Sequence, residues 1–588
     1  MVDTQKFIQY FRTKKITSFT YLNITQFLGA LNDNIYKLLI AFFLIQQLGA
    51  DRSYLIFSTT GAIFVLPFLL FSSNSGTLAD RFSKRNIIVF TKILELLVMS
   101  MGLMAFAFES VAFSYVTLFM MATQSAIFGP SKYGIMPEIV EIEKIPRANG
   151  LLTSFTFLAI IIGTFLASFI TDITDRNFIL AALSCTLISL AGVMMSFGIE
   201  YTPPSGSIKR LDVRFLRDIY KTLKVSYHVP SLLPAILGSA FFLFLGAYVQ
   251  LNIIPFAMEA LGLTDVQGGY LFLLTALGIG TGAVLAGRIS GKVVELGIVP
   301  TAACGITICL FLIDYYSSSL TIIIPLILIT GILGGMYQIP LDSFIQIASP
   351  NESRGQVIAA TNFLSFSGVL LASMMLYLLS GVIGLRADQG FSVLGVFAGC
   401  VTIYFSFQFY DYVSRFVGMI LSKLHFSTTY EGLDNIPSEP ALYVCQHTAW
   451  NDTLLMLGAQ RLRMRFFIQN EQEHKGWMKR LYKFLRVVFI PEVETLSDNL
   501  ESIHSIGKTL RRGISICIFV ENMAIEDEIN MILSSTAFCD VLKAHETKII
   551  PVKIEKGAKE KSHRFLPMLM NRIHIPAYLT FYQPKEIA

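Results

Sequence analysis

The sequence predicts a multi-domain protein in which an all-α bundle of twelve membrane-spanning helices precedes a smaller α/β domain. The 588 residues are 53% hydrophobic and 15% charged, whereas soluble domains carry about 25% charged residues. Up to residue 412 the apolar residues gather in long runs. Beyond it, short runs rich in β-branched residues alternate with helical stretches, which is typical of an α/β layer domain.

The membrane part is predicted from the length of its apolar stretches, because a bilayer-spanning helix needs about 20 mainly apolar residues. Twelve stretches qualify, and Gly and Pro within them are tolerated in membrane helices. The first six are 18–48, 53–73, 86–108, 110–130, 149–171 and 176–198. The second six are 231–256, 267–287, 296–314, 319–344, 356–380 and 390–410.

These stretches divide the chain into five parts. We expect an N-terminal six-helix half at 1–200, a basic linker at 201–230, a second six-helix half at 231–411, an amphipathic linker at 412–429 and the α/β domain at 430–588. Basic residues mark cytoplasmic segments. They precede the first span, follow the second and fill the 201–230 linker. Both termini and the α/β domain are therefore expected in the cytoplasm.

The loop after the second span carries a family resemblance. GTLADRFSKR, from Gly76 to Arg85, resembles the G-x-x-x-D-R-x-G-x-R/K-R loop of the major facilitator superfamily, with Ser83 in place of a glycine. QFLGALNDNIYK, GPSKYGIMPE, FLGAYVQLNIIPFAMEALGL and AGRISGKVVELGIVP resemble segments of bacterial lysophospholipid transporters. RANGLLTSFTFLA and RGQVIAATNFLSF open the fifth span of each half, as in a parallel repeat. The resemblance implies inward flipping of lysophospholipids, such as lysophosphatidylethanolamine, across the bacterial inner membrane.

Polar residues inside the predicted spans mark a candidate transport path. A charge at mid-bilayer costs about 2.5–3.5 kcal/mol on insertion scales, so such residues usually face a cavity. We favour contact with a zwitterionic headgroup, or gating, for at least one of them. The alternative is pairing along one helix, Asp33 with Lys37 and Lys92 with Glu95. For the glutamines, simple helix-to-helix bonding is equally expected. The set is Asp33, Asn34, Lys37, Lys92, Glu95, Gln250 and Gln338.

The loop residues are expected to gate the path rather than to bind substrate. Asp80 lies near a helix end, where a basic residue or a helix dipole is a suitable partner that would latch the two halves. A solvated turn is the alternative. The gating set is Gly76, Asp80, Arg81 and Arg85, with Arg288 in the matching loop of the second half.

The α/β domain holds a candidate catalytic pair. His447 follows the short apolar run ALYVC, and Asp452 comes five positions later. If the histidine ends a strand and the aspartate enters the next helix, the carboxylate can hold one imidazole nitrogen. The other nitrogen then acts as general base for a hydroxyl that attacks an acyl thioester.

Later blocks resemble the glycerolipid acyltransferase family of the lysophosphatidic-acid type. IIPV, from Ile549 to Val552, matches its strand block, and FVEN, from Phe519 to Asn522, lies where the family has F-P-E-G. The family holds its phosphorylated acceptor there. Glu521 and Asn522 are thus the acceptor-binding candidates, although FVEN lacks the proline and glycine.

The combined interpretation is a transporter that brings lysophospholipid to a cytoplasmic acyltransferase for re-acylation. Acyl-carrier protein or acyl-CoA is the expected donor. We expect no bound cofactor, no nucleic-acid partner and no metal, since no cysteine pair has metal-ligand spacing. One alternative is a transporter with a degenerate, regulatory or docking tail. Another is a major-facilitator exporter of a different amphiphile.

Overall fold

The computed structural model divides into two compact units, Met1–Gln408 and Phe409–Ala588. It describes residues 17–585 apart from the gaps 50–52, 210–211, 213, 291–292, 438, 447–451, 460–462, 470–484, 486, 491–499, 521–523, 557–559 and 562–572.

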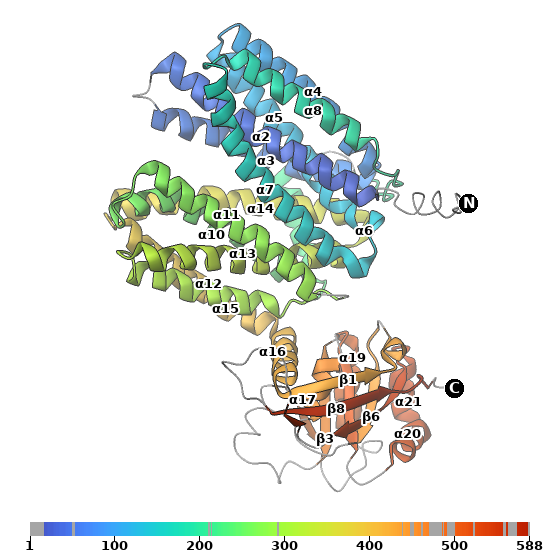
Figure 1. The fold of residues 1–588 in the computed structure, drawn as a ribbon. Coiled ribbons are helices and arrows are strands. Elements are labelled where there is room, and N and C mark those ends of the chain that lie inside the picture. The colour runs from blue at the N-terminus through green and yellow to red at the C-terminus, as the bar shows by residue number, and fades with distance from the viewer. Residues whose placement is uncertain are drawn as a thin grey trace, which may run out of the picture. The chain divides into compact units, whose positions relative to one another are not determined.

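The first unit contains the predicted membrane helices. Twelve helices of its described residues are long and apolar enough to cross a membrane. Figure 1 draws them as two groups, blue to teal for the N-terminal half and green to yellow for the C-terminal half. The first group is α2 (Ser18–Leu48), α3 (Ser53–Arg81), α4 (Lys84–Ala107), α5 (Val111–Gly134), α7 (Ile145–Ile173) and α8 (Phe178–Ser196). The second is α10 (Leu232–Glu259), α11 (Asp265–Ser290), α12 (Ile298–Tyr315), α13 (Leu320–Ala348), α14 (Arg354–Leu376) and α15 (Ala387–Gln408).

The two halves meet along α3 with α14 and along α7 with α11. Glycines permit both approaches. A Cβ at Gly76 would lie 2.6 Å from the Ala359 Cβ, and one at Gly150 would lie 2.5 Å from the Ala283 carbonyl oxygen. Small residues at such crossings let membrane helices pack by backbone contact, since lipid supplies no hydrophobic drive for helix association.

The connections that follow α3, α5 and α8 contain short elements. Ser83, which replaces the family's glycine, has φ −57° and caps α4 by accepting a bond from the Asn86 N–H. A glycine is therefore not needed for this turn. The linker between the halves contains the helix α9 (Phe215–Tyr227). A single turn of helix, α6 (Met136–Ile139), follows α5.

The second unit is an α/β domain built on one mixed sheet. Its strands are β1 (Phe426–Glu431), β2 (Leu442–Gln446), β3 (Met464–Gln469), β4 (Val488–Ile490), β5 (Ser515–Val520), β6 (Ile549–Lys556), β7 (Glu560–Lys561) and β8 (Ile573–Phe581). The order is β1-β8-β6-β2-β5-β3-β4, with β7 paired to β8. The predicted runs ALYVC, ISICIFV and KIIPVKIE are β2, β5 and β6.

Helices cover both faces of this sheet. Leu442 and Val444 of β2 pack with α19 (Leu500–Arg511), α20 (Ile525–Ser534) and α21 (Thr536–Lys543). Tyr443 and Cys445 point to the opposite face and pack with α17 (Asp452–Ala459). Burial on both faces explains why β2 is an unbroken apolar run.

Residues 412–429, which we expected to form a linker, belong to the folded domain. They lie in α16 (Tyr410–His425) and in β1. The helix packs against α17, and β1 pairs in parallel with β8. The amphipathic pattern of this segment thus comes from packing within the unit.

Candidate functional sites

A cavity of about 320 Å³ lies between the two halves of the first unit. Apolar walls come from Phe64, Phe68 and Phe128 of one half and Leu243 and Phe366 of the other. The polar lining residues include Gln26, Asp33, Asn34, Lys92, Gln124, Ser125, Lys132, Ser239, Gln338, Asp342 and Gln346. Both signs of charge therefore face one space.

Asp33 enters this cavity from α2. Its Oδ2 accepts a 2.8 Å hydrogen bond from Ser125 Oγ of α5. Lys37 lies outside the lining, with its Nζ 5.4 Å from the centre of the Phe64 ring. Both side chains are described, and no ion pair joins them. Asp33 and Lys37 therefore do not form the direct ion pair that the alternative of pairing within α2 describes.

Lys92 and Glu95 do pair along α4. Lys92 Nζ lies 2.6 Å from Glu95 Oε2, and Asn32 Nδ2 donates to Glu95 Oε1 at 3.2 Å. Both charged side chains are nearly fully buried, with 3% and 1% exposed. Only Lys92 of the two lines the cavity. The Lys92 ammonium therefore lines the cavity, and Glu95, which lies outside the lining, neutralises its charge.

The second half contributes a polar cluster that sequence reasoning found only in part. Gln338 Nε2 donates to Asp342 Oδ1 at 2.6 Å and to Ser239 Oγ at 2.7 Å. Asp342 was missed, although a carboxylate inside the predicted span 319–344 is itself a signal. Lys132 was missed because it lies just past the end of the predicted span 110–130. Gln250 is exposed on α10 and lies outside the lining.

Asp80 joins the two halves at the end of α3. Its Oδ1 accepts a 2.6 Å bond from the Gly355 N–H, and its Oδ2 accepts a 2.9 Å bond from the Gln356 N–H. These two N–H groups lie in the first turn of α14, where backbone amides have no acceptor within the helix. The helix dipole favours a negative charge at this end. Asp80 is fully buried. We call this arrangement the Asp80 contact.

A second polar contact between the halves lies near the same end. Asn149 of α7 and Gln346 of α13 exchange two amide hydrogen bonds, both 3.1 Å long, and Asn149 also donates to Ser343 Oγ. Lys84 Nζ binds Glu138 and the Ser205 hydroxyl, each at 2.6 Å.

The basic residues of the gating set lie around these contacts rather than in them. Arg85 donates to the Ile199 carbonyl at 3.2 Å. Arg81 and Arg288 are exposed at the ends of α3 and α11.

In the second unit, two parallel strands end together beside the candidate catalytic residues. Gln446 and Val520 pair as the last residues of β2 and β5. Asp452 is fully buried and begins α17, as expected for a carboxylate in the first turn of the helix. His447, Glu521 and Asn522 lie outside the described residues. In the chain, His447 directly follows Gln446, and Glu521 directly follows Val520.

Cys517 lies within β5 and is fully buried. Burial raises the pKa of the Cys517 thiol well above its usual range, and the charges of Cys445 and Asp452 add to that shift. Because the thiolate is the nucleophilic form of cysteine, this shift disfavours a nucleophilic role for Cys517.

Comparison with known proteins agrees with the two units. Residues 22–373 match the Major Facilitator Superfamily profile, and residues 427–555 match the Acyltransferase profile. The chain belongs to the Major Facilitator Superfamily and carries a fused acyltransferase-family domain. It is therefore an integral membrane transporter by family.

Curated relatives match the transporter unit. The lysophospholipid transporter LplT of Photorhabdus laumondii is 26% identical over 55% of this chain and 78% of that protein. LplT of Salmonella arizonae is 26% identical over 63% of this chain and 91% of that protein.

Solved structures share the fold of this unit. The human organic anion transporter MFSD10 has a TM-score of 0.55 and 15% identity over 66% of this chain and 99% of that one. FucP in the outward conformation has a TM-score of 0.54 and 13% identity over 67% of this chain and 99% of that one.

Proposed function

We propose that the first unit carries lysophospholipids across the bacterial inner membrane. The observation that carries this proposal is the cavity between the halves, where Asp33 and Asp342 face the same space as Lys92 and Lys132. A zwitterionic headgroup needs an anionic partner for its amine and cationic partners for its phosphate. The names of the matched relatives favour the same substrate class.

The size of the cavity suits a headgroup better than a whole lipid. Its volume of about 320 Å³ is at the small end of ligand pockets, which span about 300–1,000 Å³. We infer that the headgroup occupies the polar cavity while the acyl chain lies between helices. The Asp80 contact and the Asn149–Gln346 pair would close one end of the path. By the distribution of basic residues, that end is cytoplasmic, as are the termini and the acyltransferase domain.

Uptake of labelled lysophosphatidylethanolamine into proteoliposomes tests this proposal. Asp33→Asn should lower the initial rate at least about tenfold. The reason is that one lost contact to a charged group costs about 1.4 kcal/mol or more, which corresponds to a factor of about ten. Gln250→Leu is the matched control, because this residue lies outside the cavity lining and should leave the rate unchanged. Equal rates for Asp33→Asn and the wild type would contradict the headgroup site. Absence of uptake by the wild type would favour the exporter of another amphiphile.

For the second unit we propose re-acylation of the delivered lysophospholipid. The free hydroxyl of the lipid attacks the thioester carbonyl of acyl-carrier protein or acyl-CoA. His447 takes the hydroxyl proton, the carbon–sulfur bond breaks, and the released thiol receives that proton. Asp452 would orient the imidazole, and Glu521 and Asn522 would hold the acceptor. Support comes from the family match, the buried Asp452 and the paired ends of β2 and β5.

The alternative is a transporter whose tail has lost catalysis and serves in regulation or docking, which the altered FVEN block favours. His447→Ala separates the two. If uptake persists while the diacyl product disappears in the presence of acyl donor, the tail is an enzyme. If diacyl lipid forms at the wild-type rate, His447 is not its base. If the wild type forms none with either donor, the docking alternative holds.

A further inference from the structure

The linker between the two halves carries a surface helix with two unlike exposed stripes. On α9, Leu216, Tyr220 and Tyr227 recur at helical spacing and are 60%, 68% and 72% exposed. Beside them, the exposed residues Arg217, Lys221 and Lys224 recur at spacings of four and three. Apolar and aromatic groups next to a basic row are typical of helices that lie in a membrane interface.

The opposite face of α9 is fastened to the transporter. Asp218, the acidic residue of this helix, is buried and lies 3.3 Å from Lys209 Nζ. Ile219 and Ser226 are buried beside it. The ring of Phe215 lies 6.2 Å from that of Phe363 in α14. The acidic charge is thus turned inward and neutralised, so the exposed face carries net positive charge.

The same lysine ties the helix to the Asp80 contact. Lys209 Nζ donates to Gln356 Oε1 at 2.8 Å, and the Gln356 N–H is one of the two donors to Asp80. An unbroken path therefore runs from Asp218 on α9 to Asp80, through the Asp218–Lys209 ion pair, the Gln356 side chain and the Gln356 backbone N–H. The linker also reaches the same end through Ser205, which accepts from Lys84 at 2.6 Å.

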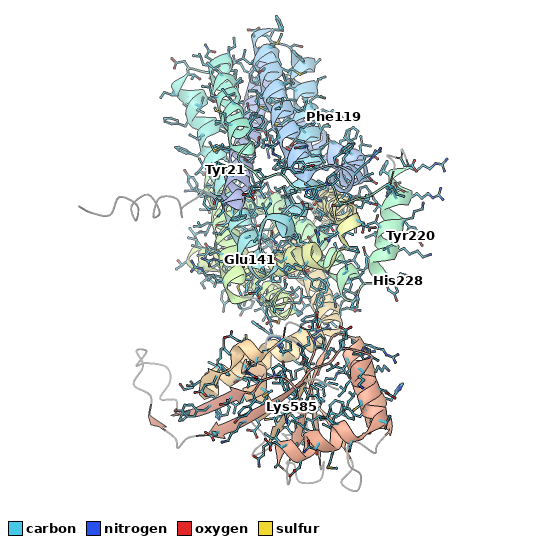
Figure 2. All side chains as sticks on the ribbon, turned by 90° about the vertical axis from the view of Figure 1, so that its right-hand side faces the viewer. Tyr21, Phe119, Glu141, Tyr220, His228 and Lys585 are labelled. Carbon is cyan, nitrogen blue, oxygen red and sulfur yellow. The ribbon has the colours of Figure 1, made fainter. Side chains whose placement is uncertain are left out.

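Along the chain, α9 lies directly before a membrane-spanning helix. It ends at Tyr227, and the membrane-spanning α10 begins at Leu232. Figure 2 shows α9 at the edge of the transporter unit, with Tyr220 directed away from the bundle. Tyrosines are enriched at the membrane–water interface, where the ring is apolar and the hydroxyl stays hydrated. An anionic lipid surface would complement the basic row of this face.

We propose that α9 binds the headgroups of anionic phospholipids and that this binding stabilises the Asp80 contact. The headgroup phosphates bind Arg217, Lys221 and Lys224, while Leu216, Tyr220 and Tyr227 enter the interface. With α9 held at the surface, Asp218 keeps Lys209 in place, and Lys209 keeps the start of α14 at Asp80. The anionic lipid content of the membrane then regulates how often this end of the transporter opens. This inference does not depend on which molecule the transporter carries.

Hydrogen–deuterium exchange of the full chain in lipid nanodiscs tests both parts. One set of nanodiscs holds phosphatidylcholine alone, and the other holds phosphatidylcholine with phosphatidylglycerol at a ratio of about 7:3. Each basic residue near an anionic surface favours binding about fivefold. Phosphatidylglycerol should therefore slow exchange of residues 215–227 by about tenfold or more. Exchange of the Gly355 and Gln356 amides, which reports opening of the Asp80 contact, should slow with it.

Three variants separate the steps. Arg217→Gln/Lys221→Gln/Lys224→Gln should lose the phosphatidylglycerol effect at both places. The matched control, Lys508→Gln/Arg511→Gln/Arg512→Gln, removes the same charge from exposed positions of the second unit and should keep both effects. Lys209→Met should keep the effect on α9 and lose it at residues 355–356.

Several outcomes would overturn the proposal. Equal protection of α9 in neutral and anionic nanodiscs means that no anionic lipid binds there. Protein or neutral lipid would then be what protects the helix from exchange. An undiminished phosphatidylglycerol effect in the triple α9 variant excludes the basic row as the site. Protection of α9 without any change at residues 355–356 in the wild type refutes the coupling to the Asp80 contact.

Discussion

Removing the charge of Asp80 should weaken closure of the transporter at one end. In Asp80→Asn, one oxygen remains for the two N–H donors of Gly355 and Gln356, and the new amide points its own N–H groups at the other. A hydrogen bond to a charged group contributes about 1.5–3 kcal/mol, and an unsatisfied buried donor costs about 1–3 kcal/mol. We expect the opening equilibrium to shift by about 2–4 kcal/mol, or roughly 30-fold to 1,000-fold.

Hydrogen exchange of the amides of Gly355 and Gln356 measures this shift directly, because an amide exchanges only when its bond to Asp80 opens. Asp388→Asn is the matched control. Asp388 lies in the second half and pairs with Arg386 at 3.2 Å, away from the Asp80 contact. Wild-type exchange at both amides in Asp80→Asn, with unchanged helix content, would refute the latch.

Three further predictions concern close packing, the second contact between the halves and catalysis. Gly76→Ala should lower the melting temperature of the purified protein because the new Cβ meets the Ala359 Cβ at 2.6 Å, at a cost of about 1–3 kcal/mol, whereas Gly61→Ala, with open space, should not. Equal melting temperatures would contradict the packing of α3 on α14. Asn149→Leu should speed deuterium exchange around residue 346 roughly fivefold or more, because the buried Gln346 amide loses its partner at a cost of about 1–3 kcal/mol. Unchanged exchange would show that the Asn149–Gln346 pair does not stabilise the contact between the halves. Asp452→Asn should lower kcat for diacyl lipid formation by about 100-fold to 10,000-fold with little change in KM. The control Asp434→Asn, at an exposed position, should match the wild type. A rise in KM with unchanged kcat would point to a role of Asp452 in acceptor binding instead.

Local patterns predicted the elements of both units. Twelve apolar stretches became twelve candidate spans, because apolar length alone decides whether a helix can cross lipid. The runs ALYVC, ISICIFV and KIIPVKIE became strands because β-branched residues packed on two faces favour a central sheet position. The segment 412–429 was misjudged because an amphipathic helix at a domain surface and one in a linker have the same pattern.

The partners of the polar residues were harder to predict. Helical spacing proposed one partner for Asp33 and one for Lys92, and only the second pair is a direct ion pair. Asp33 instead binds Ser125, which is 92 positions away in the sequence. Spacing along one helix reports only neighbours on that helix, whereas a buried carboxylate takes whichever donor the packed bundle brings nearest.

The sequence by itself determined the two-unit organisation, the membrane spans and the strands, and it predicted that Asp80 would latch the halves. Tertiary structure alone decided what Asp80 binds, which charges share the cavity, and how Lys209 connects the surface helix to that contact. The donors to Asp80 lie 275 and 276 positions away, and they are backbone amides that every residue but proline possesses. Such donors cannot be recognised in a sequence, because a backbone N–H is available only where a helix starts in the fold.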